Sequence, residues 1–272
     1  MKNYLKLSVA SLVMATVCIN FSSCSSDNDD KSSPDTPVVV GPSNVFTGLT
    51  PKSVMGTTFT YNSNGQVIEI LTQDGDKYKF TYGSGLTTRV TNPDNTIRVE
   101  SEEYIFNLEI GNNGFIKYCE QTEKWKNEID TWEFGYNSDS QLNYMKRSEG
   151  DNEVTNITYS NGDITRVRMH AEDDSRVKDD YVIEYTSESV TNKIENKGCI
   201  MLFDQTFGID MDEFWFFYYA GLLGKATKHL PVSQTDMLDD GPYKTELYTW
   251  QLNSDGYPVL LQTEQNSYRF TW

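Results

Sequence analysis

Apolar and polar residues alternate along most of the chain, and many of the apolar positions are aromatic. Polar residues such as Lys77, Lys79 and Thr81 fill the positions between them. Successive side chains of a β-strand point to opposite faces of its sheet, so this period of two predicts strands with one aromatic and one solvated face. The clearest apolar sets are Tyr78/Phe80/Tyr82, Trp132/Phe134/Tyr136, Tyr181/Ile183/Tyr185, Tyr248/Trp250/Leu252 and Tyr268/Phe270/Trp272.

A short motif recurs where these strands end, an apolar anchor residue followed by a turn rich in Asn, Ser, Asp and Gly. The first six copies begin 21 to 28 residues apart, which indicates a repeated supersecondary unit. Turns of this composition tolerate positive φ and therefore join antiparallel strands in hairpins. The copies are Tyr61–Gly65, Tyr82–Gly85, Ile110–Gly114, Tyr136–Ser140, Tyr159–Gly162, Tyr185–Glu188 and Leu252–Gly256.

The repeat predicts an all-β fold, a long antiparallel meander of roughly a dozen or more strands. A meander of that length must curl into an open or closed barrel-like sheet. Two turns carry a weaker signal, because Tyr136–Ser140 lacks glycine and Tyr185–Glu188 lacks both asparagine and glycine.

One inserted helix is expected near residues 210–224, in the segment that interrupts the repeat. Asp210 is a suitable N-cap, and Glu213 three residues later completes a capping box. Ile209 and Phe214 stand at the two positions of a hydrophobic staple. The helix is apolar on nearly every side, so we expect the concavity of the curled sheet to bury it.

Glycines and lysines mark the expected end of this helix. Gly221 or Gly224 should end it, and Lys225 and Lys228 follow where positive charge is favourable.

The chain begins with the layout of a secretory signal peptide over residues 1–23. Lys2 and Lys6 precede an uncharged, mostly apolar run that is too short for a comfortable membrane span. Cys24 follows Phe21-Ser22-Ser23, which resembles a bacterial lipobox, so Cys24 is the predicted lipidation site and N-terminus of the mature chain. Ordinary signal cleavage beside an accidental cysteine is the alternative.

Residues 24–44 are predicted to be a flexible linker, which leaves residues 45–272 as a single β-meander domain. The Ser and acidic run from Ser25 to Asp30 is similar to an export signal that sends some Gram-negative lipoproteins to the cell surface. A solvated spacer would have the same composition. We therefore expect an outer-membrane lipoprotein, on the cell surface or the periplasmic face.

The repeats resemble a family of lipoproteins from Gram-negative gut bacteria, catalogued as a domain of unknown function with a porin-like fold. The unit Phe59–Gly65 and the late segment Leu222–Pro231 carry the resemblance, which covers most of residues 55–272. It implies a curled or barrel-like sheet around a helix, and it brings no catalytic residues.

A transmembrane pore is a second interpretation of the same alternation. The final residue, Trp272, is aromatic, as in many outer-membrane barrel strands. Most apolar runs are nevertheless shorter than the ~9–11 residues of a spanning strand. An apolar helix also fits poorly in a water-filled lumen, and a lipid anchor would be redundant for an embedded protein, so we favour the anchored domain.

The charge balance excludes one class of function. Asp and Glu number 40 against 23 Lys and Arg, for a net charge of -17, whereas nucleic-acid binding depends on clustered basic residues. No nucleic-acid partner is therefore expected. Aromatic residues make up 13% of the chain, and their regular period of two favours core packing over stacking against sugar rings.

Few residues are suited to catalysis or to metal binding. His170 and His229 are the only histidines, and neither has a nucleophile motif nearby. No His/Cys pair has the spacing of a zinc site, so we expect neither a metal nor a cofactor. Cys119 and Cys199 could form a disulfide in an oxidising envelope, and two buried free thiols are the alternative.

Carboxylates cluster more often. Pairs of them can hydrolyse glycosides when held ~5–10 Å apart, and they can also bind calcium, but no cluster matches an EF-hand loop. A solvated acidic surface explains them more simply. The clusters are Glu172–Asp174, Asp179–Asp180, Asp210–Glu213 and Asp239–Asp240.

Together these patterns predict a lipid-anchored, non-enzymatic envelope protein. We expect a binding or interaction module that captures a glycan, lipid or protein at the rim of the sheet or in its cavity. A purely structural envelope component is the second hypothesis, and a glycoside hydrolase is the third.

Overall fold

The computed structural model describes residues 39–85, 89, 95–126, 128–238 and 241–272. The predicted signal peptide and the predicted lipidation site at Cys24 lie outside these residues, as do Asp239 and Asp240.

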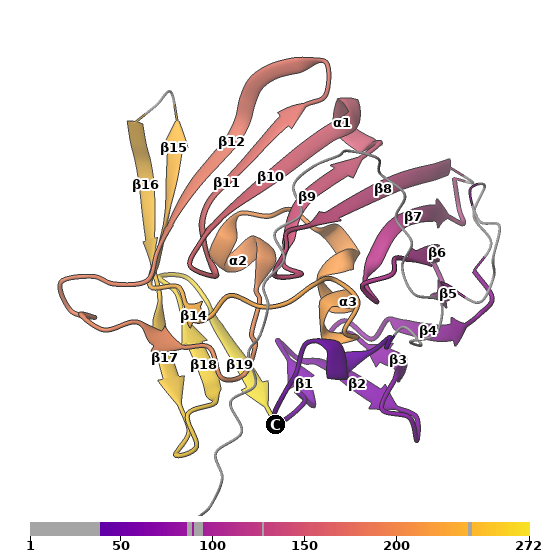
Figure 1. Ribbon diagram of the computed structural model, residues 1–272, viewed down its shortest axis with the longest axis horizontal. Coiled ribbons are helices and arrows are strands. Elements are labelled where there is room, and N and C mark those ends of the chain that lie inside the picture. Colours follow the sequence, from indigo (N-terminus) through magenta and orange to yellow (C-terminus); the bar gives the residue numbers. More distant parts are fainter. Residues whose placement is uncertain (1–38, 86–88, 90–94, 127, 239–240) are drawn as a thin grey trace, which may run out of the picture. The chain divides into compact units, whose positions relative to one another are not determined.

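Seventeen strands of the described residues form one antiparallel sheet (Figure 1). They are β1 (Ser53–Val54), β2 (Thr57–Tyr61), β3 (Val67–Leu71), β4 (Lys77–Tyr82), β5 (Thr96–Glu100), β6 (Tyr104–Ile110), β7 (Ile116–Glu123), β8 (Glu128–Tyr136), β9 (Leu142–Arg147), β10 (Glu153–Ser160), β11 (Asp163–Ala171), β12 (Asp174–Glu184), β15 (Ser233–Leu238), β16 (Gly241–Leu247), β17 (Thr249–Leu252), β18 (Pro258–Gln262) and β19 (Ser267–Thr271).

Most strands pair with the next strand of the sheet along the chain, and the last strand pairs with the first. From β2 to β12 the pairing is consecutive, and β12 then pairs with β15 across the inserted segment. In β1, Val54 lies opposite Phe270 of β19 and Thr57 of β2. The meander is therefore nearly closed into a barrel, which confirms the predicted architecture.

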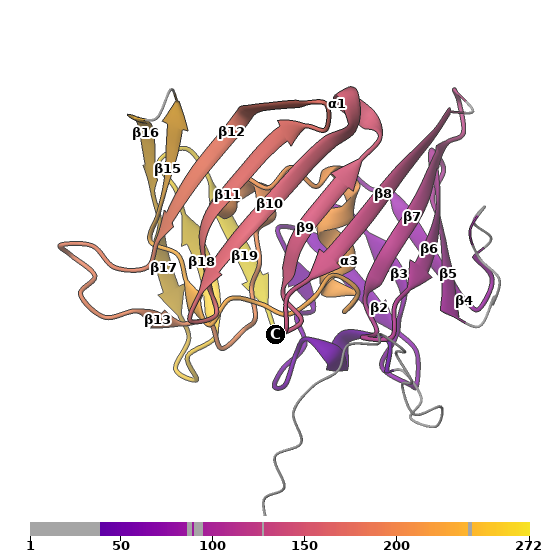
Figure 2. The same ribbon diagram turned by 45° about the horizontal axis from the view of Figure 1, so that its top comes forward.

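One junction of the ring has a different form. Strands β16 and β17 are separated only by Tyr248; β16 pairs with β15, and β17 pairs with β18. One extended stretch of chain therefore pairs with β15 before Tyr248 and with β18 after it. In Figure 2, β15 and β16 stand above β17 and β18 at this side of the sheet.

The repeated turns share one construction. A register shift precedes the anchor residue in five of them, at Tyr61, Ile110, Tyr136, Tyr159 and Leu252. Where Asn follows the anchor, as Asn137 does, its side-chain oxygen accepts two backbone N–H groups of the turn, from Asp139 and Gln141. These bonds fix the turn without help from the rest of the fold.

The turn without glycine is formed like the others. Ser140 has φ 63°, close to the 76° of Gly65 and the 85° of Gly256 at the matching positions. The Tyr185–Glu188 turn is different, because the chain there leaves the meander and enters the inserted segment.

The inserted segment carries short helices inside the curled sheet (Figure 1). Helix α2 (Phe203–Phe207) is followed by the 3₁₀ turn η3 (Asp212–Phe214) and by α3 (Trp215–Tyr219). The predicted helix near residues 210–224 is thus shorter than expected. It begins at Asp212 without a side-chain cap, and α2 was not anticipated.

Backbone packing explains why α3 ends early. Gly221 adopts φ 79°, and a Cβ atom on it would lie 2.1 Å from the backbone of Gly41. The helix therefore stops where the incoming chain crosses it. Gly41 and Pro42 are buried at this crossing, so the compact unit begins before residue 45.

The core consists of aromatic side chains from both the sheet and the helices. Phe214 is fully buried and contacts the rings of Phe106, Trp132 and Phe134 from the wall. Most of the predicted inward positions are buried or half-buried, as expected. Leu252 is the exception at 42% exposure.

Candidate functional site

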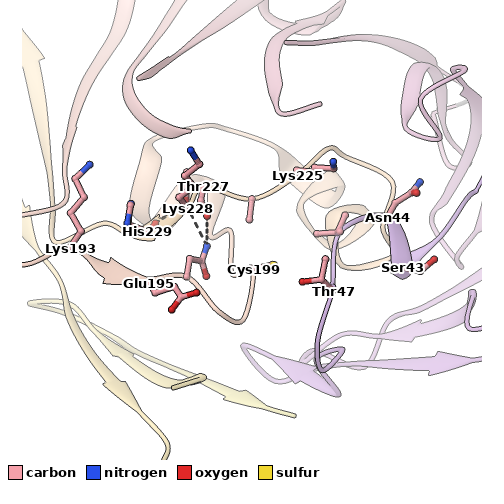
Figure 3. Close-up of a pocket in the computed structure, with 13 residues that line it drawn as sticks. Ser43, Asn44, Thr47, Lys193, Glu195, Cys199, Lys225, Thr227, Lys228 and His229 are labelled. Atoms are coloured by element: carbon pink, nitrogen blue, oxygen red, sulfur yellow. Dashed lines mark hydrogen bonds between the residues drawn. The ribbon is translucent and has the colours of Figure 1, made fainter. Parts of the chain in front are cut away.

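A pocket of about 840 Å³ lies beside the inserted segment. Its walls come from residues 43–47, 193–199 and 225–229 (Figure 3). The first stretch begins within the 3₁₀ turn η1 (Pro42–Asn44). The second contains strand β13 (Ile194–Glu195), and the third ends at the first residue of its partner β14 (His229–Leu230). The lining is mainly polar and charged, unlike the aromatic interior of the sheet.

The lysine segment, residues 225–229, forms one wall and is fixed by backbone hydrogen bonds. The N–H of Lys225 donates to the carbonyl of Ser140 at 2.9 Å, and the N–H of Lys228 donates to that of Gly162 at 3.1 Å. Gln141 is buried and donates its amide to the carbonyls of both Gly162 and Ala226. The turns after β8 and β10 therefore hold this segment.

A buried asparagine fixes the opposite wall. The side-chain oxygen of Asn196 accepts the N–H of Ile200 at 2.8 Å, and its amide donates to the carbonyls of Ile200 and Thr227. The N–H of Asn196 also donates to the carbonyl of Lys228 at 2.9 Å. Two segments distant in sequence are thus joined at the base of the pocket.

Asp163 binds the side chains of Lys193 and His229 at the pocket edge. Its side chain is 1% exposed and accepts the backbone N–H of His229, while the ring Nδ1 of His229 lies 2.9 Å from Oδ2. Lys193 Nζ lies 2.7 Å from the same oxygen. Buried charges require such partners, and His229 and Lys193 supply them for Asp163.

The charged residues that line the pocket are mostly basic, although the chain as a whole is acidic. Three lysines line it against one glutamate, in a chain of net charge -17. Lys193 is paired with Asp163, whereas Lys225 and Lys228 are exposed and form no ion pair with any described residue. In Figure 3 the carboxylate of Glu195 points away from the amino groups of Lys193 and Lys228.

Both cysteines of the described residues are free thiols. Cys119 is buried in the core, and burial raises its pKa well above the usual value. Cys199 lines the pocket, and burial also raises its pKa. The disulfide between them is therefore not formed, and neither thiol has the lowered pKa of a catalytic cysteine.

The remaining residues singled out from the sequence are dispersed. His170 lies on β11, with its Nδ1 2.8 Å from the carbonyl of Ala171. Glu172 pairs with Lys146, and Asp180 binds both Arg166 and Arg168. No group of three or more His, Cys, Asp or Glu among the described residues could hold a metal ion.

The third acidic cluster does come together, around an arginine. Arg147 binds Asp210 at 2.9 Å, Asp212 at 3.1 Å and also Glu153. Burial and the neighbouring Asp210 raise the pKa of Asp212 to about 6. Asp212 and Trp215 border two hollows of about 340 and 410 Å³, but the carboxylates serve as partners of Arg147.

The pocket itself was not predicted from the sequence. Lys225 and Lys228 were interpreted as charges that favour a helix end, yet α3 ends at Tyr219 and both lysines belong to the pocket. The available signal is the mainly polar stretch Lys225–His229, which shows neither the period of a helix nor that of a strand.

Within the described residues, no helix has the length and apolar character needed to cross a membrane.

Comparison with known proteins supports the fold. Residues 77–260 match the family described as a domain of unknown function (DUF4595) with porin-like fold. A crystal structure of a porin-like protein from Bacteroides uniformis is similar, with TM-score 0.57 and 17% identity over 79% of this chain and 88% of that one. A porin-like protein from Bacteroides vulgatus gives TM-score 0.55 and 14% identity over 82% of this chain and 99% of that one. No curated protein matches the sequence.

Proposed function

Because this chain belongs to the family of domains of unknown function (DUF4595) with porin-like fold, we propose its function from the pocket. It is a lipid-anchored envelope lipoprotein that acts as a binding module, and the ligand occupies the pocket between residues 43–47, 193–199 and 225–229. The domain is non-enzymatic.

One observation carries the binding role, a pocket of ligand size with rigid polar walls. A volume of about 840 Å³ is within the range of small-molecule sites. Hydrogen bonds to Ser140, Gly162 and Asn196 hold the lysine segment before any ligand arrives. A preorganised wall lowers the ordering cost of binding, which favours recognition over a merely structural role.

The filled interior supports a binding domain over a pore. Apolar side chains of α2, η3 and α3, including Phe203, Phe214 and Phe217, occupy the space enclosed by the strands. The outward positions Lys77, Lys79 and Thr81 on β4 are exposed and polar, whereas a spanning barrel presents apolar residues to lipid.

The anchor at Cys24 rests on the lipobox resemblance. Acyl chains on this cysteine would hold the mature chain at the outer membrane, since each buried CH₂ contributes ~0.8 kcal/mol. Membrane fractionation tests the idea with the Cys24→Ala variant, and Cys18→Ala serves as the matched control. We expect only the first variant to leave the membrane fraction. Unchanged membrane association of Cys24→Ala would refute the anchor.

A ligand screen tests the binding role. The Cys24→Ala protein would be exposed to glycan and lipid collections, and hits would be mapped by NMR of backbone amides. We expect shifts at Thr227, Lys228 and His229. Hits that map only to other surfaces, or a complete lack of hits, would favour a structural envelope component instead.

A further inference from the structure

The backbone of the two unpaired lysines of the pocket is held by hydrogen bonds. Lys225 and Lys228 are anchored through their own N–H groups, and the carbonyl between them, that of Ala226, accepts from the buried amide of Gln141. Their side chains therefore extend from a stretch of backbone that three hydrogen bonds hold in place. Gly162 reinforces this, because a Cβ there would lie 2.7 to 3.0 Å from three carbons of the Lys228 side chain.

The other charged groups of the pocket do not neutralise these lysines. Asp163 is engaged by His229 and Lys193, so its charge is already matched. Glu195 is exposed and faces away from Lys228 in Figure 3. The protein is acidic overall, with a net charge of -17. Two lysines that have no acidic partner among the described residues therefore give this pocket a positive local field, opposite in sign to the charge of the chain.

Uncharged hydrogen-bonding groups also line the pocket. Ser43 and Thr47 are exposed there, and Asn44 between them is half-buried. Such side chains can donate to or accept from hydroxyl groups. The pocket therefore combines a site for an oxyanion with partners for a polyhydroxylated carrier, in a volume that accepts a molecule of sugar size.

We propose that this pocket binds an anionic, hydroxyl-rich ligand, and that Lys225 and Lys228 contact its phosphate or carboxylate group. The inference rests on the proposed binding function and names the ligand class for the same pocket. The carrier is either a free acidic sugar or the headgroup of an anionic lipid. The chemistry at the lysines is the same in both cases.

Isothermal titration calorimetry with the Cys24→Ala protein tests the ligand class. The probes are glucose 6-phosphate and glucuronic acid, with glucose as the neutral counterpart. We expect an acidic sugar to bind at least about tenfold more tightly than glucose, because hydrogen bonds to charged groups are the stronger ones. Added salt should weaken that binding by screening the exposed lysines.

Vesicle flotation separates the two sources of the anion. Vesicles of phosphatidylcholine with phosphatidylglycerol are compared with vesicles of phosphatidylcholine alone. Flotation only with the anionic vesicles, without binding of the acidic sugars, assigns the anion to a lipid headgroup. Binding of the acidic sugars without flotation assigns it to a free sugar.

Matched charge variants locate the site. K225E/K228E reverses both pocket lysines, and K52E/K244E makes the same charge change at two exposed lysines outside the pocket. We expect the first pair alone to reduce affinity, by about tenfold or more. Circular dichroism should show both variants folded, since all four lysines are exposed.

The outcomes separate this inference from the binding function itself. Equal binding of glucose and the acidic sugars at the pocket amides would overturn the anionic class and leave the binding function intact. An equal loss of affinity in the two variants would also overturn it. If neither the probes nor the glycan and lipid collections shift the pocket amides, both the inference and the binding function are wrong.

Discussion

At the scale of single residues, tyrosine hydroxyls explain why the repeat uses tyrosine as its anchor. Tyr82, Tyr136 and Tyr159 each donate to a carbonyl at the start of the preceding strand, at 2.6 to 2.9 Å. Phenylalanine would fill the same space but would leave a carbonyl without this donor. Each hydroxyl therefore joins adjacent hairpins.

Tyr136→Phe tests this role. Loss of the 2.6 Å bond to Ile116 should lower the free energy of unfolding by about 1 kcal/mol, the usual net value of such a bond. Urea denaturation measures the change. Tyr243→Phe is the control, because Tyr243 is 71% exposed and should tolerate the change. Equal effects of the two substitutions would contradict the role of the hydroxyl.

Asp212 makes stability depend on pH. Burial and Asp210 raise its pKa from 3.8 to about 6, so the folded state favours the protonated carboxyl. The associated stability is present below about pH 4 and is lost as the pH rises through about 6. Asp212→Asn removes this titration.

Melting temperatures across that window test the assignment. We expect the melting temperature of Asp212→Asn to rise relative to the unmodified protein as the pH increases from about 4 to about 7. Asn also tolerates the positive φ of 43° at this position. Ser138→Asn, in an exposed turn, is the control, because it replaces a side chain without changing the number of titratable groups. A constant difference between Asp212→Asn and the unmodified protein would exclude Asp212 as the titrating group.

At the scale of elements, the short helical segment acts as the core of the sheet. Phe214→Ala should lower the free energy of unfolding by about 3–5 kcal/mol, because it removes a ring packed against Phe106, Trp132 and Phe134. Trp215→Ala changes the next residue, which is only half-buried, and should cost less. Urea denaturation compares the two, and a larger loss for Trp215→Ala would contradict this account of the core.

Local patterns predicted the strands and turns but only part of the helical segment. Period-two alternation and Asn/Gly turns are each determined by a few neighbouring residues. The sequence therefore predicts them correctly, even at the turn that has Ser140 in place of glycine. Helix α2 spans five residues, fewer than a helical period needs to be recognised. The end of α3 depends on contact between Gly221 and Gly41, which no local pattern contains.

At the scale of the whole molecule, the pocket could not be predicted because its walls meet only after the ring forms. Thr47, Asn196 and Lys228 are far apart in sequence. The N–H of Asn196 donates to the carbonyl of Lys228 and so joins two of these stretches. In the sequence alone, Lys225 and Lys228 resemble the positive charges that follow the C-terminal end of a helix. The same dependence on ring closure gives the seam between β1 and β19 particular importance.

Strand β1, which is only two residues long, joins the last strand, β19, to β2. Val54 is fully buried there, and the N–H groups of Lys52 and Met55 donate to the carbonyls of Thr271 and Arg269. Val54→Ala should leave a cavity at this seam and lower stability by about 2 kcal/mol. A short strand should open locally before the rest of the sheet unfolds.

Hydrogen exchange of individual amides can detect that opening. In Val54→Ala we expect the amides of Lys52 and Met55 to exchange faster, while those between β10 and β11 keep their rates under native conditions. Ser53→Ala is the control, because Ser53 is only half-buried and keeps its backbone pairing. Equal acceleration at every amide would mean that the ring opens only by global unfolding, and that the seam is no weaker than the rest of the wall.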